Sequence, residues 1–330
     1  MPAQPHWHWR NPATRSTVYQ ALLLAGLLAL LALLVWNTHQ NLRARGIPSG
    51  FDFLWQPAGF GIGESLWRFD AAQSYAQAFV AGLGNTLRVA LPGIALATVL
   101  GTLVGVGRLS GNALLRGVCR AYVEWFRNIP LLLHLLMAYL LLTEFLPDPA
   151  AAIQLGPLFW SKGGLSFPVP LWDAGALWWS LPRQGEFAVE GGGALTPEFL
   201  ALWLGLSLYT AAFVAELVRA GIASVPQGQR QAAQALGLRP GQVLRAVVMP
   251  QALRLIVPPL TNQYLSLTKN SSLAVAIGYP ELVSIANTAI NQTGRAVECI
   301  AIVMAVYLSL SLLTALAMNA YNQRVRRGSL

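Results

Sequence analysis

The sequence has few charged residues and few cysteines. Charged residues make up 11% of the 330 positions, whereas a soluble domain usually has about 25%, which excludes an ordinary soluble enzyme. The two cysteines, Cys119 and Cys299, lie in different segments and outside any CxxC, so the sequence predicts neither a disulfide framework nor a metal site. The patterns GxxxxGK[ST], HExxH and GxSxG do not occur, and we therefore expect no Walker-type nucleotide loop and no hydrolase motif.

Long apolar blocks dominate the chain, in which 55% of the residues are hydrophobic. The formal charge is +9, yet the 22 Lys and Arg residues stand between the apolar blocks and not in a run with interleaved aromatics. This arrangement favours membrane topology over binding to nucleic acid. Six blocks are apolar enough to enter a bilayer, and they comprise residues 18–36, 89–106, 129–143, 199–215, 246–268 and 299–318.

Two of these blocks have unusual features. The block at 18–36 follows two arginines like a signal peptide, but no small-x-small cleavage site comes after it, so we expect an uncleaved anchor. The block at 246–268 carries Arg254 and also Pro258 and Pro259, which remove helical hydrogen bonds. It is predicted to be a bent span that protein shields from lipid.

The arginines indicate the orientation, because Lys and Arg are retained on the cytoplasmic side during insertion. They concentrate before the first block, between the second and third, between the fourth and fifth, and after the sixth, whereas the long segments 37–85 and 147–198 hold few. Six spans with both termini in the cytoplasm fit this bias. Segment 147–198 also carries Trp160, Trp172, Trp178 and Trp179, which fit either the headgroup level of the bilayer or a docking surface for an extracytoplasmic partner.

The loop between the fourth and fifth blocks predicts a short surface helix. Residues 227–238 are rich in alanine and glutamine, and Gly237 with the turn sequence at 239–241 ends the helical pattern. A helix with a small apolar face fits a groove on another protein. The alternative is a helix in the lipid headgroup plane, which would favour Trp, Phe and Leu where alanine stands here.

This loop resembles the EAA loop of ABC importer membrane subunits, which reads EAA, three residues, G, nine residues and I-x-L-P. The matching positions are Gln231, Ala232, Ala233, Gly237 and 247–250. Segments 85–87, 124–130, 216–229 and 260–281 are similar to further elements of polar amino-acid permeases. The chain is thus identified as a member of that family, and its extra N-terminal span and its insertion resemble the larger, broad-specificity L-amino-acid permeases of Gram-negative bacteria.

The resemblance implies an all-α, polytopic inner-membrane protein with a type I ABC importer permease core of five spans and one extra N-terminal span. The expected organisation is a cytoplasmic segment 1–17, an anchor 18–36, a periplasmic segment 37–80, a permease domain 81–322 with a periplasmic insertion 147–198 and a coupling loop 225–250, and a cytoplasmic tail 323–330.

The resemblance also implies the partners. Two permease subunits, here expected to be similar but not identical, form the pathway, and a periplasmic binding protein delivers the amino acid. A cytoplasmic ABC ATPase dimer binds ATP and Mg, so the permease is not itself an enzyme and needs no cofactor. Contact with the ATPase is assigned to Gln231, Ala232, Ala233, Gly237 and Leu238, although Gln231 stands where the family has glutamate.

A dense group of polar residues follows Pro258 and Pro259, and a lipid-facing helix does not carry such a group at bilayer depth. We expect a substrate pathway lined by Gln263, Lys269, Asn270, Ser271 and Ser272. The alternative is that these side chains only hold helices together. An ion-coupled secondary transporter would also use a broken helix here, but it predicts no coupling loop.

Two further titratable positions have structural interpretations. His134 is expected to be a partnered helix-packing residue rather than a proton relay, because no second titratable group lies one turn away. Glu216 and Arg219 are expected to form an i,i+3 pair at the membrane edge and not to contact substrate.

Overall fold

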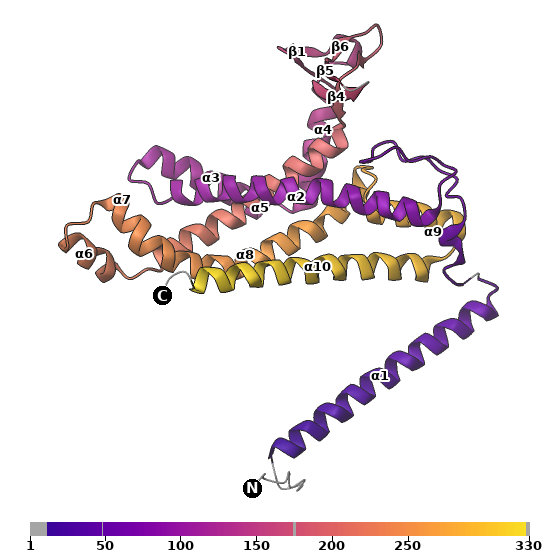
Figure 1. Ribbon diagram of the computed structural model, residues 1–330, viewed down its shortest axis with the longest axis horizontal. Helices are drawn as coiled ribbons and strands as arrows, with labels where there is room; N and C mark the ends of the chain where they lie inside the picture. Colours follow the sequence, from indigo (N-terminus) through magenta and orange to yellow (C-terminus); the bar gives the residue numbers. More distant parts are fainter. Residues whose placement is uncertain (1–11, 48, 174–175, 328–330) are drawn as a thin grey trace.

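The computed structural model describes residues 12–47, 49–173 and 176–327, so residues 1–11 of the expected segment 1–17 and residues 328–330 of the tail lie outside the described residues. Long helices form a bundle, a group of strands stands at the end of α4, and α1 points away from the bundle (Figure 1). The helices are α1 (Pro12–Ala44), α2 (Tyr75–Gly107), α3 (Ala113–Asn128), α4 (Leu131–Glu144), α5 (Pro197–Ala223), α6 (Gln227–Ala235), α7 (Pro240–Val243), α8 (Met249–Asn270), α9 (Leu282–Thr293) and α10 (Ala296–Arg327).

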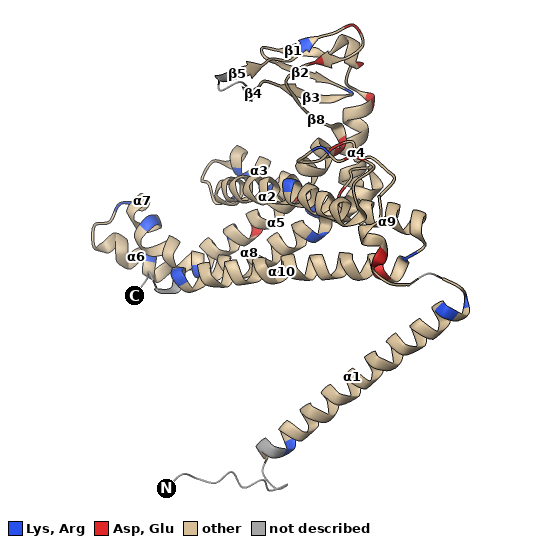
Figure 2. Cartoon of the chain, turned by 45° about the vertical axis from the view of Figure 1, so that its right-hand side comes forward, with Lys and Arg blue, Asp and Glu red and all other residues tan. Residues whose placement is uncertain are grey.

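Five described helices are long and apolar enough to cross a membrane, and a sixth span results if α3 and α4, which meet at 106°, count as one. The mostly helical membrane fold is therefore confirmed. The helices extend past the apolar blocks: α2 begins at a capping box between Ser74 and Gln77. α10 continues to Arg327, so the described part of the expected tail is helical. Charged positions are scarce along most of α10 (Figure 2).

The centre of the bundle is the packing of α2 against α5. Gly101 and Gly105 of α2 face α5 so closely that a Cβ at Gly101 would lie 2.6 Å from the Cβ of Val214, and one at Gly105 would lie 2.7 Å from the carbonyl oxygen of Ala215. Small residues in this spacing allow two helix backbones to approach in a membrane. The apolar core around this contact includes fully buried side chains from α2, α4, α5 and α8.

The helix in the expected bent span is not interrupted at its prolines. α8 continues through Pro258 and Pro259, and the helical pattern changes only after Asn270, where a 3₁₀ segment runs from Ser271 to Ala276. A π-helical turn, Leu244–Val248, precedes α8. Neighbouring helices are able to compensate a proline inside a membrane helix, and α8 packs against α5 and α10.

In the described part of the insertion between α4 and α5 there are eight strands, which the all-α expectation did not include. Strands β1 (Ile153–Leu155), β2 (Leu158–Ser161), β3 (Gly164–Phe167) and β8 (Gly193–Leu195) form an antiparallel sheet in the order β1-β2-β3-β8. Two separate hairpins are β4 (Val169–Asp173) with β5 (Ala176–Ser180) and β6 (Arg183–Gln184) with β7 (Val189–Glu190). Trp172, Trp178 and Trp179 are exposed on the β4–β5 hairpin, so both interpretations of these tryptophans stay predictions.

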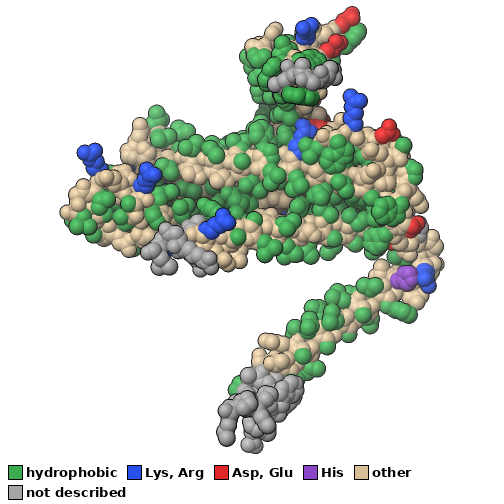
Figure 3. Space-filling model, viewed as in Figure 1, with side chains coloured by type: hydrophobic (Ala, Val, Ile, Leu, Met, Phe, Trp, Pro, Cys, Tyr) green, Lys and Arg blue, Asp and Glu red, His purple; other side chains and the backbone are tan. Residues whose placement is uncertain are grey.

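Helix α1 lies apart from the other spans. None of the apolar stretch of α1 is buried against the rest of the chain, and its hydrophobic side chains are visible along its surface (Figure 3). The segment after α1 is nevertheless attached to the bundle by a short 3₁₀ turn, Asp52–Trp55, whose Phe53 is buried beside Tyr75 of α2. The remaining surface of α1 is suited to lipid or to another chain.

Candidate coupling site and pathway

The loop after α5 forms the short helix that the sequence predicts, and glycine ends it. The backbone N–H of Gly237 donates to the carbonyl of Gln234 (2.9 Å), and that of Leu238 donates to the carbonyl of Ala233 (3.2 Å). These two bonds define a Schellman motif, which needs a left-handed residue at the glycine position. Gly237 has φ = 84°, so the stop after α6 depends on the absence of a side chain there.

The predicted coupling residues divide between two faces of α6. Ala233 is buried in an apolar cluster with residues of α5, α7 and α8, and Leu238 packs against that cluster. Gln231 and Ala232 are exposed, and a Cβ at Gly237 would meet no atom within 4 Å. One face therefore fixes α6 to the membrane helices, and the other is open to a partner.

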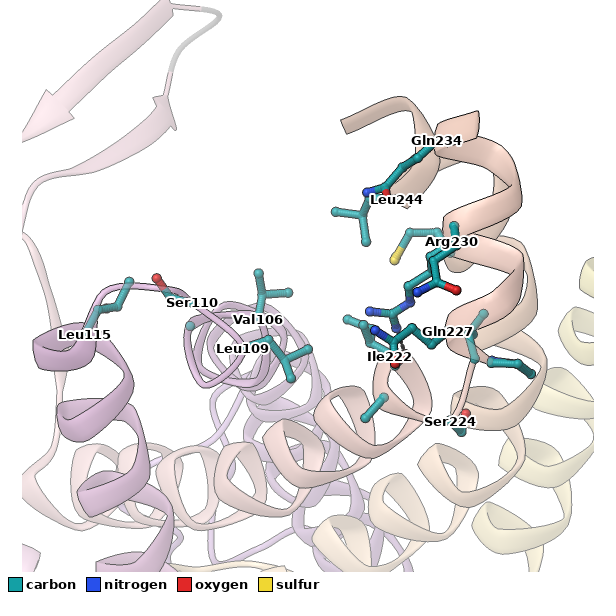
Figure 4. Close-up of a pocket in the computed structure, with 16 residues that line it drawn as sticks. Val106, Leu109, Ser110, Leu115, Ile222, Ser224, Gln227, Arg230, Gln234 and Leu244 are labelled. Atoms are coloured by element: carbon teal, nitrogen blue, oxygen red, sulfur yellow. Dashed lines mark hydrogen bonds between the residues drawn. The ribbon is translucent and has the colours of Figure 1, made fainter. Parts of the chain in front are cut away.

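The start of α6 is tied back to the spans that flank it. The guanidinium of Arg230 donates to the carbonyl of Ile222 near the end of α5, and the side chain of Gln251 on α8 donates to that of Gln229. A cavity of about 980 Å³ separates α6 from the end of α2, with Arg230 and Leu115 among the residues that line it (Figure 4). The helix is thus held at its base and along one face.

A charged cluster lies where α2 and α5 approach this cavity. Glu216 pairs with Arg219 of the same helix (2.5 Å), which confirms the predicted i,i+3 pair. Glu216 also pairs with Arg108 at the end of α2, a contact that the sequence analysis missed because sequence spacing gives no sign of it. A second cavity of about 380 Å³, lined by Arg108, Arg127, Glu216 and others, adjoins the cluster.

The predicted pathway residues lie on different sides of α8 and the 3₁₀ turn after it. At about 100° per residue, Gln263, Lys269 and Asn270 share one side with Asn262 and Ser266, where Asn262, Ser266 and Lys269 are exposed. We call these five residues the α8 polar stripe. Lys269 forms no salt bridge within the part of the chain that the structure describes.

Beyond the end of α8, the two serines of the predicted pathway differ in exposure. Ser271 is fully buried and its hydroxyl donates to the carbonyl of Thr268 (2.7 Å). Ser272 is half-buried. The helix turn therefore brings Gln263, Lys269 and Asn270 together but places Ser271 in the protein interior.

The end of the bundle farthest from α6 is closed by buried hydrogen bonds at the start of α9. The fully buried carboxylate of Glu281 accepts hydrogen bonds from the backbone N–H groups of Val283 (2.8 Å) and Ser284 (3.0 Å), and from the hydroxyl of Tyr307 (3.1 Å). It thereby caps α9 and joins it to α10. The family-like segment 260–281 ends at this residue, but the resemblance assigned no structural role to it.

Hydrogen bonds and an ion pair also attach the loop before α2 to the α9 end of the bundle. Asn85, fully buried, donates from its amide to the carbonyls of Glu64 (2.7 Å) and Pro280 (2.8 Å). The carboxylate of Glu64 pairs with Arg88 (2.7 Å) and accepts a hydrogen bond from Thr196. Burial raises the pKa of Glu64 above its ordinary value of 4.5, although Thr196 and Arg88 act to lower it.

An ion pair and two hydrogen bonds join the segment after α1 to the start of α10. Arg295 pairs with Asp52 and donates to the carbonyl of Gly50, while the N–H of Gly50 donates to Glu298 (2.6 Å). The hydrogen bonds from Arg295 hold the pKa of Asp52 below its ordinary value of 3.8. The chain between α1 and α2 is therefore fastened to α10.

His134 has the packing role that the sequence predicts but not the expected partner. It is buried at the start of α4, and its ring stacks on Phe126 with centroids 4.8 Å apart and lies 6.0 Å from Tyr209. Neither ring nitrogen has a hydrogen-bond partner among the described residues. Within the described residues, no group of three or more His, Cys, Asp or Glu side chains is placed to hold a metal ion.

The fold and the loop helix together define a class of protein: a multi-span helical membrane protein that presents a glycine-terminated helix between its later spans. Residues 97–327 match the family described as "Binding-protein-dependent transport system inner membrane component". The chain belongs to that family and is the membrane component of an ABC importer, not its ATPase.

Similar proteins cover almost the whole chain. The chain is 41% identical to the "General L-amino acid transport system permease protein AapQ" of Rhizobium johnstonii, over 97% of this chain and 95% of that protein. It is 41% identical to the "Putative amino-acid ABC transporter permease protein YhdX" of Escherichia coli, over 96% of this chain and 95% of that protein. A solved structure described as "Crystal structure of an amino acid ABC transporter with histidines" matches with a TM-score of 0.57 and 25% identity, over 76% of this chain and 95% of that one.

Proposed function

We propose that the chain is a transmembrane subunit of an importer that uses ATP to move polar L-amino acids delivered by a periplasmic binding protein. Its similarity to permeases named for L-amino acids supports the substrate class, and the exposed helix α6 with its glycine stop carries the proposal for coupling. An ion-coupled secondary transporter has no use for such a helix.

In this proposal the exposed side of α6, with Gln231 and Ala232, enters a groove on the ATPase. The buried side joins α6 to the membrane helices, because Ala233 shares one apolar cluster with Val218 of α5 and Ile256 of α8. Interiors packed this closely move as units rather than deforming continuously. Closure of the ATPase pair would therefore displace α5 and α8 together.

The proposed pathway follows the α8 polar stripe. The ammonium group of Lys269 is suited to the carboxylate of a zwitterionic amino acid, and the side-chain oxygens of Gln263 and Asn270 are suited to its ammonium group. Exposed polar groups at bilayer depth need protein or water beside them. A second, similar permease subunit across the pathway satisfies this need, and a heterodimer is the assembly we propose.

The proposed organisation keeps the boundaries that the sequence indicates. The N-terminal segment 1–17 and the coupling loop 225–250 lie in the cytoplasm, with the tail 323–330 on the same side. The segment 37–80 and the insertion 147–198 lie in the periplasm, and the anchor 18–36 and the permease domain 81–322 cross the bilayer. The positive-inside bias supports this orientation.

Reconstitution tests the function directly. The chain is purified from its native membrane with whatever copurifies, and uptake of labelled acidic, neutral-polar and basic amino acids into proteoliposomes is measured with the binding protein present. We expect an ATPase and a second permease to copurify, and uptake to require ATP. Uptake that follows an imposed ion gradient without ATP would instead establish the secondary transporter.

A further inference from the structure

Helix α3 is oriented differently from α4, the helix that follows it. It begins at Asn112, whose side chain caps it by accepting hydrogen bonds from the N–H groups of Leu114 (2.9 Å) and Leu115 (3.2 Å). It then meets α4 at 106°, so the two helices do not form one straight crossing. Figure 1 shows α3 beside the end of α2, on the same side of the molecule as α6, with α4 leading away to the strands.

One face of α3 is packed against the bundle. Cys119 and Val123 are buried, and Val123 shares an apolar cluster with Ala212 and Ala215 of α5. The hydroxyl of Tyr122 donates to a carbonyl of α5 (2.6 Å). At about 100° per residue these side chains lie together on one third of the helix circumference.

A second face is apolar and exposed. Leu114, Val118, Ala121 and Trp125 follow one another at spacings of three and four residues and therefore form a single stripe. Leu114 is 77% exposed, Val118 61% and Trp125 56%. Tryptophan on such a stripe is typical of the level at which lipid headgroups begin.

The third face is charged and carries a net positive charge. Arg116, Arg120, Glu124 and Arg127 occupy it. Arg120 pairs with Glu124 (2.7 Å), and both side chains are mostly exposed. Three arginines against one glutamate leave this face with an excess of positive charge. Arg127 also lies over a ring of α5, 5.3 Å from its centroid.

The residues around α3 indicate where it lies relative to the membrane boundary. Arg127 lines the same small cavity as the ion pair between Arg108, at the end of α2, and Glu216, in the last part of α5. A charged cluster marks the level at which the apolar part of a span ends. α3 therefore crosses α5 near a membrane boundary, the one on the side of α6.

We propose that α3 lies in the plane of the bilayer interface, with its apolar stripe among the acyl chains and with Arg116 and Arg120 beside the phosphates of anionic phospholipids. A helix that is amphipathic, basic on its polar face and equipped with Leu and Trp on the other has the composition of interfacial helices. Long arginine side chains reach the headgroup level while their stems stay on apolar surface. That this is the cytoplasmic leaflet rests on the proposed function, which places α6 in the cytoplasm.

Spin labels in the assembled, nanodisc-embedded transporter test this placement. Val118→Cys reports on the stripe and Arg116→Cys on the charged face, each in a Cys119→Ser, Cys299→Ser background. We expect the label at 118 to be accessible to oxygen and shielded from a water-soluble nickel complex, and the label at 116 to show the reverse. Leu114→Cys gives a second reading of the stripe if the Val118 variant does not assemble.

Two other results would overturn the proposal. A label at 118 that is shielded from both oxygen and nickel would show that protein, such as the second permease, covers the stripe. A label at 118 that is as accessible to nickel as the one at 116 would show that water covers it. Neither result depends on transport, so the placement of α3 is tested separately from the proposed function.

The headgroup contact has its own test. Spin-labelled phosphatidylglycerol and phosphatidylcholine are compared for the fraction that the wild-type complex immobilises, and we expect a preference for phosphatidylglycerol that Arg116→Gln/Arg120→Gln abolishes. Arg183→Gln, an exposed arginine of the insertion, is the matched control and should keep the preference. An unchanged preference in the double variant would refute the arginine contact.

Discussion

The two ends of the helical bundle satisfy their polar groups in different ways. At the α9 end, Glu281 and Asn85 are fully buried and bond to other parts of the same chain. At the α6 end, Gln231 and Ala232 are exposed, and Ala233 is the one buried residue of α6. Buried hydrogen bonds of this kind favour a single arrangement, although the amide oxygen of Asn85 has no partner among the described residues. The exposed side of α6 is free to contact a second molecule. The α9 end is therefore closed by the chain itself, and the α6 end is available to a partner.

Changing the glycine stop of α6 should have the largest effect. Gly237→Val places a β-branched residue at φ = 84°, a conformation that costs an L-residue about 1–2 kcal/mol, and it should turn α6 away from its groove. We expect ATP-driven uptake and substrate-stimulated ATP hydrolysis to be lost while the protein remains in the membrane. Normal values of both would contradict the role given to α6.

The end of α1 offers a matched control for this substitution. Gly46 has φ = 64°, and the N–H groups of Gly46 and Ile47 donate to the carbonyls of Arg43 and Leu42 in the same Schellman pattern. Gly46→Val introduces comparable backbone strain far from α6. Uptake should be largely retained, and an equal loss in both variants would mean that strain alone, and not the position of α6, explains the result.

At the α9 end, Glu281→Ala should act on stability. It removes the acceptor for two backbone N–H groups and for Tyr307, and leaving buried donors without partners costs about 1–3 kcal/mol. We expect a lower melting temperature for the purified protein, and a smaller decrease for Glu281→Gln, which keeps one acceptor oxygen. Equal melting temperatures for wild type and Glu281→Ala would show that this end is not closed by the carboxylate.

Substitutions in the α8 polar stripe should change substrate selectivity, whereas substitution of the buried Ser271 should change stability. Asn270→Ala and Lys269→Gln are expected to change the ratio of uptake among acidic, neutral-polar and basic amino acids. Ser271→Ala removes an interior hydrogen bond worth about 0.5–1.5 kcal/mol. It should lower the stability of the protein and reduce the uptake of all substrates alike. If the stripe variants lose uptake uniformly and in proportion to melting temperature, the stripe holds helices together and does not line a pathway.

The smallest expected effect is the pH dependence of the ion pair between Asp52 and Arg295. Because the pKa of Asp52 in the folded protein lies below the ordinary 3.8, the pair stabilises the fold at neutral pH. That contribution is lost as the pH falls below 3.8 and the carboxylate is protonated. The difference in melting temperature between wild type and Asp52→Asn should stay constant from neutral pH to about pH 5 and shrink below that. A difference that grows on acidification would contradict the pairing.

The sequence alone predicted the features that depend on local pattern. Apolar blocks located the spans, and Gly237 with the small residues before it located α6, because a glycine stop and helix-forming residues act within a few positions. The i,i+3 pair of Glu216 and Arg219 was predictable for the same reason. The spans proved longer than the apolar blocks, since capping at Ser74 extends α2 into polar sequence.

Features that depend on distant contacts were not predictable from one sequence. The strands of the insertion are short, some of only two or three residues, and their Gly- and Pro-rich sequence gives too weak an alternation to identify them. The pairing of Arg108 with Glu216 joins residues that only the packing of α2 on α5 brings together. The continuity of α8 through Pro258 and Pro259 likewise depends on neighbouring helices, which compensate the local effect of proline.

Hydrogen exchange on the permease with and without its ATPase compares the two ends in one measurement. In the isolated permease the amides of 227–241 should exchange quickly and those of 281–293 slowly, because only the latter helix begins at a buried cap. Binding of the ATPase should protect 227–241 and leave 281–293 unchanged. If 227–241 gains no protection in a complex that hydrolyses ATP, α6 is not the contact with the ATPase and the central claim is wrong.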